Sequence, residues 1–241
     1  YLYDNDARFV FNFVRSALNY GCIAVNYVES VGASRECNLW RTQVKDKLTG
    51  EEFEIRASVL INACGPWVDE HNEMTGQSSR HRHQYSKGIH LIVNRITNTE
   101  RVLTFFASDG RLFFVIPMGP RSCIGTTDTW VEKPEQVVTA SDRQFVLDNV
   151  NKLLDLPKAL TLDDIIAERC GVRPLALQGH QDEGDWLQSS RKHVIESDAE
   201  QGHISIFGGK LTDCLNVGDE VVSLVTRFGL TVPFPDKRWY G

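Results

Sequence analysis

Two arginines stand at expected strand ends, where their side chains could bind an anion. Arg173 lies in Gly-Val-Arg-Pro-Leu (171–175), and Pro174 favours an extended backbone at the residue before it. Arg191 opens Arg-Lys-His ahead of another expected strand. Guanidinium groups bind phosphates and carboxylates through paired hydrogen bonds. On the residues alone, two surface arginines with carboxylate neighbours are the more common explanation.

A lysine and a histidine stand at the start of another expected strand, in Ser86-Lys87-Gly88-Ile89-His90. An imidazole in a cleft can act as a base near neutral pH, so His90 is a candidate catalytic residue. Lys87 is a candidate substrate contact because it places a positive charge close to His90 in the sequence. Most isolated histidines have no catalytic role, so these residues are also consistent with a structural site.

A glycine pair precedes an expected helix in Phe207-Gly208-Gly209-Lys210. Free N–H groups at a helix start favour an anion or a polarised carbonyl, although such a pair is often only a tight turn. Gly-Thr-Thr-Asp (125–128) ends a strand with three hydrogen-bonding side chains, which a capped turn would also explain.

Common motifs for nucleotides, acyl transfer and zinc are absent. The sequence contains no G-x-G, no Walker loop, no G-x-S-x-G and no H-E-x-x-H. His81 and His83 could be imagined as metal ligands. No cysteine or carboxylate stands at ligand spacing, so we expect a solvated polar loop here and no metal site.

Composition indicates a globular protein of one large or two small domains. The 241 residues are 41% hydrophobic and 24% charged, with a net charge of -6 that argues against nucleic-acid binding. No apolar run is long enough for a transmembrane helix. The six cysteines are scattered, which favours reduced thiols in a cytoplasmic compartment. The chain does not begin with Met, and we expect it to be part of a longer protein.

Periodicity predicts an α/β (α+β) chain. The first segment is helical, strands follow at 22–31, 39–44 and 52–62, and 71–86 is an exposed loop. Four short strands at 88–93, 102–106, 112–116 and 122–126 indicate a mixed or antiparallel sheet. A helix begins at Thr139, residues 163–172 are partly extended, and 178–190 is a loop. Strands at 193–196 and 203–207 lead through the glycine pair into a last helix.

Eight motifs in order resemble one known family, the FAD-dependent glycerol-3-phosphate dehydrogenases of the aerobic respiratory type. They cover nearly the whole chain: Asp-Ala-Arg (6–8), Val-Leu-Ile-Asn-Ala-Cys-Gly-Pro-Trp (59–67), Ser-Lys-Gly-Ile-His (86–90), Phe-Val-Ile-Pro (114–117), Ile-Gly-Thr-Thr-Asp (124–128), Gly-Val-Arg-Pro-Leu (171–175), Ser-Arg-Lys-His (190–193) and Phe-Gly-Gly-Lys-Leu-Thr (207–212).

The resemblance implies a fold like that of D-amino-acid oxidase, with a partial Rossmann-like FAD lobe and a substrate lobe built on a mixed or antiparallel sheet. We expect residues 1–75 and 199–230 to be FAD-lobe segments, 76–198 to be the substrate-binding domain and 231–241 to be a tail.

The resemblance also implies oxidation of sn-glycerol 3-phosphate to dihydroxyacetone phosphate by hydride transfer to FAD, with quinone or oxygen as acceptor. It makes His90 and Arg173 catalytic. Substrate contacts would come from Arg173, Arg191, Lys210 and Lys87, and FAD contacts from Val28, Gly65, Gly208, Gly209, Lys210, Leu211 and Thr212. A cytoplasmic enzyme with peripheral attachment at the inner membrane face is implied.

The chain departs from the family pattern by lacking its N-terminal G-x-G-x-x-G unit and its C-terminal cap domain. We therefore expect weak or no FAD binding, and little activity, from the isolated 241 residues. Two alternatives stay open. A related FAD oxidoreductase could hold the carboxylate of an amino acid or hydroxy acid between the two arginines, or a non-catalytic domain could have kept the fold and lost the flavin.

Overall fold

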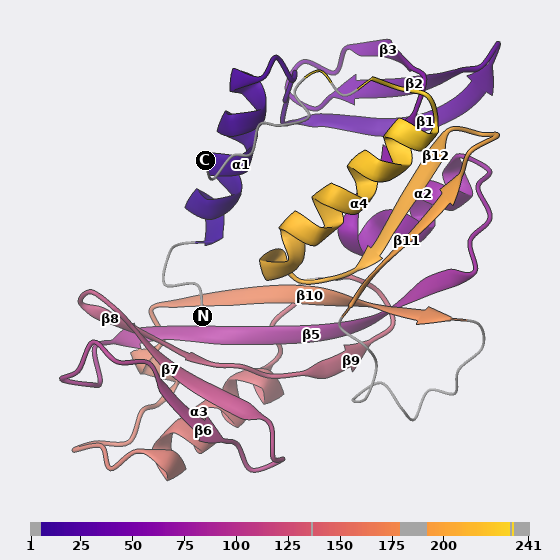
Figure 1. Ribbon diagram of the computed structural model, residues 1–241. Coiled ribbons are helices and arrows are strands. Elements are labelled where there is room, and N and C mark those ends of the chain that lie inside the picture. Colours follow the sequence, from indigo (N-terminus) through magenta and orange to yellow (C-terminus); the bar gives the residue numbers. More distant parts are fainter. Residues whose placement is uncertain (1–5, 136, 179–191, 232, 234–241) are drawn as a thin grey trace. The chain divides into compact units, whose positions relative to one another are not determined.

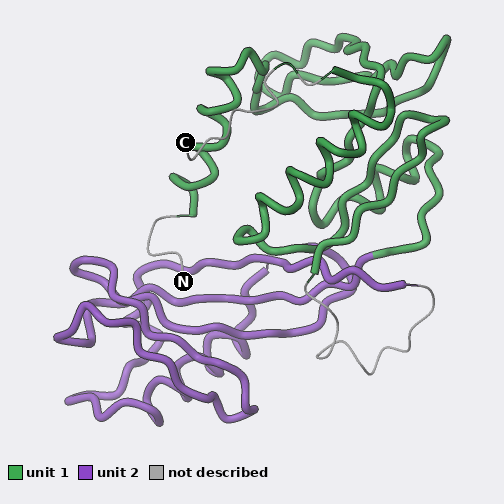
Figure 2. Tube along the Cα trace, in the orientation of Figure 1, with its two compact units in different colours: residues 1–82, 190–241 green, residues 83–189 purple. Residues whose placement is uncertain are grey.

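The computed structural model describes residues 6–135, 137–178, 192–231 and 233. The chain forms two compact units (Figure 2), a terminal unit of residues 1–82 with 190–241 and a middle unit of residues 83–189. The expected substrate domain reached from 76 to 198. The strand at 193–198, which that range included, belongs to the terminal unit.

An antiparallel sheet and one helix form the first part of the terminal unit (Figure 1). The elements are α1 (Asp6–Asn19), β1 (Val28–Glu36), β2 (Leu39–Asp46) and β3 (Glu52–Ala57). Their order in the sheet is β1-β2-β3. Charged and apolar residues alternate along β3, but Phe53 and Ile55 are exposed, so the alternation does not mark a buried face.

A second sheet of the terminal unit joins residues far apart in sequence. Its order is β11-β12-β4, with β12 antiparallel to β11 and parallel to β4. The strands are β4 (Leu60–Asn62), β11 (His193–Asp198) and β12 (His203–Gly208), and the helices that follow β4 and β12 are α2 (Val68–Met74) and α4 (Cys214–Arg227).

Hydrogen bonds between buried groups tie the terminal unit together. The indole Nε1 of Trp40, on β2, donates to the carbonyl of Gln201 at 2.8 Å. Asn72 of α2 accepts from Asn62 at 2.8 Å and from Ser205 at 2.9 Å through one side-chain oxygen. The side chains of Trp40, Asn62, Asn72 and Ser205 are buried, and the two bonds to Asn72 hold α2 to β4 and β12.

The middle unit is a sheet covered by one helix. The strand order is β10-β5-β8-β7-β6, and β9 also pairs with β5. The strands are β5 (His81–Asn94, whose first two residues belong to the terminal unit), β6 (Leu103–Phe106), β7 (Leu112–Met118), β8 (Arg121–Gly125), β9 (Thr129–Val131) and β10 (Ala167–Gln178), and the helix is α3 (Ala140–Leu153).

The core of the middle unit lies between α3 and one face of the sheet. Ile89, Leu91 and Val93 alternate along β5 and pack in one cluster with Val146 and Val150 of α3. All five side chains are fully buried. The helix begins where the sequence predicts, because Thr139 and Asp142 form a capping box.

Two strand expectations for the first half of the chain were wrong. The strand expected at 22–31 begins only at Val28, after Tyr27 turns the chain with a φ of 59°. The strand expected at 52–62 is two strands, β3 and β4, in different sheets. In each case the β-branched residues indicated an extended backbone. They did not indicate which strand the extended segment would pair with.

The loop expected at 71–86 was also wrong. Its polar residues include the end of α2 and the start of β5. The imidazole of His81 is 2.6 Å from Glu196, and His83 is buried. A polar residue with a partner can be buried, so the polarity of this segment did not indicate exposure.

A buried ion pair between β5 and α3 should stabilise the middle unit. The Lys87 ammonium lies 2.5 Å from the Asp142 carboxylate, and both residues are more than nine-tenths buried. We expect Asp142→Ala to lower the free energy of unfolding by about 3–5 kcal/mol, because it leaves an uncompensated buried charge. Urea unfolding measures this.

The matched control is Glu52→Ala, which breaks the exposed Lys45–Glu52 pair and should cost less than about 1 kcal/mol. The double variant Lys87→Met/Asp142→Ala should recover much of the loss. Equal losses for Asp142→Ala and Glu52→Ala would contradict a buried charge pair.

Candidate functional site

Strand β5 presents different residues on its two faces. Successive side chains of a strand point to opposite faces, so Lys87 and Ile89 share one face while Ser86, Gly88 and His90 share the other. Ile89 packs in the core beside α3, and Lys87 binds Asp142 of α3 and the carbonyl of Val137 at 3.0 Å. The structure therefore separates Lys87 from His90.

The guanidinium of Arg173 lies on the face of β5 that carries Gly88. Arg173 belongs to β10, the neighbour of β5 in the sheet. A Cβ atom built on Gly88 would come within 2.4 Å of the Arg173 Nη2 atom. The same nitrogen donates to the Thr126 hydroxyl at 3.3 Å, and Nη1 lies 3.6 Å from the Asp128 carboxylate. The loop after β8 thus holds this arginine.

His90 lies near the same guanidinium. Burial, with smaller effects from the positive charges of Arg173 and Arg169, lowers the pKa of His90 to about 4. The imidazole is therefore neutral at physiological pH and can accept a proton. His90 pairs with Gly125 of β8, where a Cβ atom would come within 3.1 Å of the imidazole Cδ2. The structure thus brings together His90 and Arg173, the two residues that the resemblance made catalytic.

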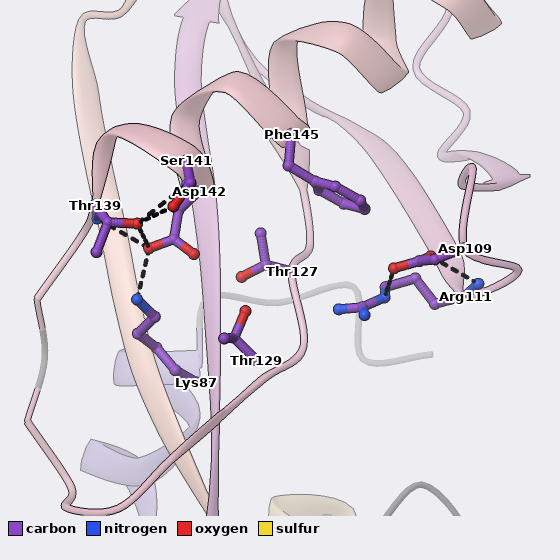
Figure 3. Close-up of a pocket in the computed structure, with 9 residues that line it drawn as sticks. All are labelled: Lys87, Asp109, Arg111, Thr127, Thr129, Thr139, Ser141, Asp142 and Phe145. Carbon is purple, nitrogen blue, oxygen red and sulfur yellow. Dashed lines mark hydrogen bonds and ion pairs between the residues drawn. The ribbon is translucent and has the colours of Figure 1, made fainter.

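A cavity of about 390 Å³ opens beside α3 (Figure 3) and is lined by Lys87 but by neither His90 nor Arg173. The remaining lining residues are Asp109, Arg111, Thr127, Thr129, Thr139, Ser141, Asp142 and Phe145. Two ion pairs, Lys87–Asp142 and Arg111–Asp109, balance its charge. It is therefore separate from the His90 and Arg173 arrangement.

Two glycine turns follow the parallel strands β4 and β12 of the terminal unit. The carboxyl ends of parallel neighbours meet at one edge of a sheet, which is where open α/β sheets bind nucleotides. After β4, Gly65 has a φ of 57° and a position for Cβ with no atom within 4 Å. At the end of β12, Gly208 and Gly209 have φ values of 62° and 91°.

These turns fit a cofactor that approaches the backbone closely. Each glycine adopts a conformation that residues with a side chain rarely adopt, and each turn leads into a short 3₁₀ helix. Lys210 precedes a short 3₁₀ turn at Leu211–Asp213, which contains Thr212 and continues into α4. The expected FAD contacts after β4 and β12 therefore lie at one sheet edge, whereas Val28 begins β1 in the other sheet.

An imidazole between two carboxylates fixes the second glycine turn. His193 Nδ1 lies 2.6 Å from Asp213, and Nε2 lies 3.0 Å from Glu220 of α4. The hydrogen bond with Asp213 raises the pKa of His193 more than burial lowers it, and Glu220 adds to the rise. A Cβ atom on Gly209 would come within 3.1 Å of the His193 Cβ, so this histidine packs directly against the turn.

Two expected substrate contacts remain, Lys210 and Arg191. Lys210 belongs to the terminal unit, whereas His90 and Arg173 belong to the middle unit. Arg191 lies outside the described residues. The sequence reasoning missed Ser86 and Thr126 as partners of the arginine arrangement and gave Asp128 only as a turn residue. The two-residue spacing of Ser86, Gly88 and His90 was the signal that could have identified one shared face.

Comparison with known proteins establishes the family. The model of the family described as DAO, FAD dependent oxidoreductase, matches residues 3–207. The chain belongs to this FAD-dependent oxidoreductase family. The aerobic glycerol-3-phosphate dehydrogenase of Staphylococcus haemolyticus is 31% identical over 230 residues, which are 92% of this chain and 40% of that protein. The Staphylococcus aureus (strain USA300) enzyme is 30% identical and matches 94% of this chain and 42% of its own length.

A crystal structure of the glycerol-3-phosphate dehydrogenase from Bacillus halodurans, complexed with FAD, has a similar fold. The TM-score is 0.82 at 31% identity, covering 97% of this chain and 45% of that chain. Glycine oxidase from Geobacillus kaustophilus shares the fold at a TM-score of 0.59 and 20% identity. These matches confirm the expected D-amino-acid-oxidase-like fold class. The chain spans about two fifths of the length of the curated relatives that it matches. Among the described residues, no helix is long and apolar enough to span a membrane.

The pKa of His193 makes the glycine turn sensitive to pH. A raised pKa means that the protonated histidine stabilises the fold below its unfolded pKa, and this contribution is lost as pH rises through the folded value. We expect Asp213→Asn to lower the Tm more at pH 6 than at pH 9, as measured by thermal unfolding. Asp219→Asn, on α4, is the control and should shift the Tm equally at both pH values. If the decrease in Tm for Asp213→Asn did not depend on pH, a charged His193–Asp213 pair would be excluded.

Proposed function

We propose that the protein oxidises sn-glycerol 3-phosphate to dihydroxyacetone phosphate with FAD as the hydride acceptor. One observation carries this proposal. A neutral imidazole, His90, and a guanidinium, Arg173, lie on one face of β5. They do so in a chain that is 31% identical to an aerobic glycerol-3-phosphate dehydrogenase over 92% of its length.

Arg173 would bind the negative charge of the substrate. Its side chain is about one third exposed, and its guanidinium contacts Thr126 and Asp128. A dianionic phosphate suits paired guanidinium groups, and Arg191 is the proposed second one. Lys210 is proposed as a further contact. Lys87 is left out of this site, because its ammonium binds Asp142 on the opposite face of β5.

His90 would take the proton from the C2 hydroxyl of the substrate. A pKa of about 4 keeps the imidazole neutral but makes it a weak base in the absence of substrate. A bound phosphate dianion would offset the charge of Arg173, which is a smaller cause of the lowered pKa than burial, and would thereby raise the pKa of His90. Substrate binding would therefore strengthen the base at the moment when it is needed.

The glycine turns of the terminal unit would hold FAD, which when bound supplies the acceptor for the C2 hydride. We assign contacts to Gly65, Gly208, Gly209, Leu211 and Thr212, and to Val28 at the start of β1. Lys210 and the backbone N–H groups after β12 would stabilise negative charge on the ring system of the cofactor. His193 would keep this turn in place through Asp213.

Quinone or oxygen would take the electrons onward. A quinone dissolved in the bilayer can be reached only by a protein at the membrane surface, so we associate that acceptor with peripheral attachment. Oxygen needs no such attachment.

Replacement of the proposed base should mainly reduce kcat. Because we expect the isolated 241 residues to bind FAD weakly, the test uses the longer protein of which we expect this chain to be part. We expect His90→Gln to lower kcat of that FAD-loaded protein by roughly 10²–10⁴-fold. The rate of flavin reduction by glycerol 3-phosphate measures this. His71→Gln replaces a different buried histidine, which binds Ser30 in the terminal unit, and should leave kcat unchanged. Full activity in His90→Gln would rule out the proposed base.

The decrease of kcat/KM at low pH should report the pKa of His90 in the protein without substrate. Because the pKa of His90 is lowered to about 4, the imidazole stays neutral as pH falls until that value is approached. We therefore expect kcat/KM to show no loss from His90 protonation between pH 6 and pH 8, and a loss near pH 4. An acid limb at pH 6.5 that disappeared in His90→Gln would show that the lowered value is wrong.

The substrate class can be tested directly. Glycerol 3-phosphate should reduce the bound flavin, whereas lactate and glycine at equal concentration should not, because they carry no phosphate. Rapid reduction by lactate or glycine would favour the related carboxylate-binding oxidoreductases. No reduction by any of the three would favour a non-catalytic domain.

A further inference from the structure

We propose that Gly88 is a positioning residue for the substrate site, because the absence of a side chain there lets Arg173 lie against β5 beside His90. Ser86, Asp128 and Thr126 would help to hold the guanidinium in this position. This inference rests on the proposed function, since it concerns the arginine that would bind the substrate. The residues involved all belong to the middle unit.

The need for glycine at position 88 is one of space. A Cβ atom there would lie 2.4 Å from Nη2, 2.6 Å from Nη1 and 2.7 Å from Cζ of Arg173. Real Cβ contacts are not this short. The φ of Gly88 lies outside the left-handed region, so the backbone itself would accept another residue. By contrast, Gly125 has a φ of 142° and is required by its backbone as well.

Three polar groups fix the guanidinium over Gly88. Ser86, two residues away on the same face of β5, donates a hydrogen bond from its hydroxyl to Asp128 Oδ1. That oxygen lies 3.6 Å from Arg173 Nη1, while Thr126 accepts from Nη2 at 3.3 Å. Ser86 is 1% exposed, so this hydroxyl acts inside the protein and not at the surface. The sequence Ser86-x-Gly88-x-His90 therefore supplies an orienting group, an empty space and a proposed base along one face.

A methyl group at position 88 would move the arginine without unfolding the sheet. The atoms that it meets are the far end of a long, flexible side chain, which can rotate away at little cost. Loss of the guanidinium position, with stability kept, is thus the expected signature of Gly88→Ala. A role in packing alone would give the opposite result, which is lower stability with an unchanged site.

The test compares Gly88→Ala with Gly171→Ala in the full chain. Gly171 lies on β10, the strand of Arg173, and a Cβ atom there has no neighbour within 4 Å. NMR titration of isotope-labelled histidine follows the pKa of His90, to which the nearby charge of Arg173 contributes. We expect the pKa of His90 to rise above about 4 in Gly88→Ala. In Gly171→Ala it should remain at about 4. An unchanged His90 pKa in both variants would overturn the proposal.

Substrate affinity gives a second readout. Calorimetric titration with glycerol 3-phosphate should show binding roughly 10- to 100-fold weaker in Gly88→Ala, the range expected from losing a charge-assisted hydrogen bond. Ser86→Ala should weaken binding in the same direction. Unaltered affinity in Gly88→Ala would contradict the proposal. Absence of binding by the unmodified protein would instead count against the proposed function, while the His90 titration still decides the role of Gly88.

A folding defect in Gly88→Ala would also be informative. The double variant Gly88→Ala/Arg173→Ala removes the guanidinium that the methyl group meets, so it should fold with a Tm equal to that of Arg173→Ala. Failure of the double variant to fold would overturn the proposal, because the clash would then involve atoms other than those of Arg173.

Discussion

The two faces of β5 constrain the rest of the middle unit. One face must be apolar to bury α3, and the other must hold a charged guanidinium beside a neutral imidazole. Because side chains alternate strictly along a strand, a shift of one residue in its pairing would exchange these faces. The register with β8, which places His90 opposite Gly125, is therefore a condition for the site as well as for the core.

The terminal unit meets a different constraint. Its parallel strands β4 and β12 bring two glycine turns to one sheet edge, and the turns are useful only if the backbone keeps left-handed conformations there. The polar network of Asn62, Asn72 and Ser205 fixes the strands below this edge. His193 fixes the second turn from the side. Buried polar contacts thus do much of the positioning in this unit, whereas apolar packing does so in the middle unit.

Local patterns predicted the elements whose signals are self-contained. The helix after Thr139 was confirmed because its capping box and apolar spacing both lie within a few residues. The four strands expected between residues 88 and 126 were confirmed as parts of β5 to β8. The division of 52–62 into two strands was missed, because the choice of sheet depends on partners elsewhere in the chain. For the same reason, the sequence named His90, Arg173 and Lys87 as candidates but could not show that Lys87 lies on the opposite face of β5. The partner of Lys87, Asp142, is 55 residues away in the sequence.

The pairing of β4 with β12 has a consequence for how the chain folds. Leu60 pairs with His203, and the whole middle unit lies between these two residues in the sequence. During synthesis from the ribosome, residues 83–189 can collapse while β4 still has an open edge. Closing so long a loop is a non-local and intrinsically slow event. The topology therefore favours an order of assembly in which residues 83–189 form their sheet before β4 and β12 pair.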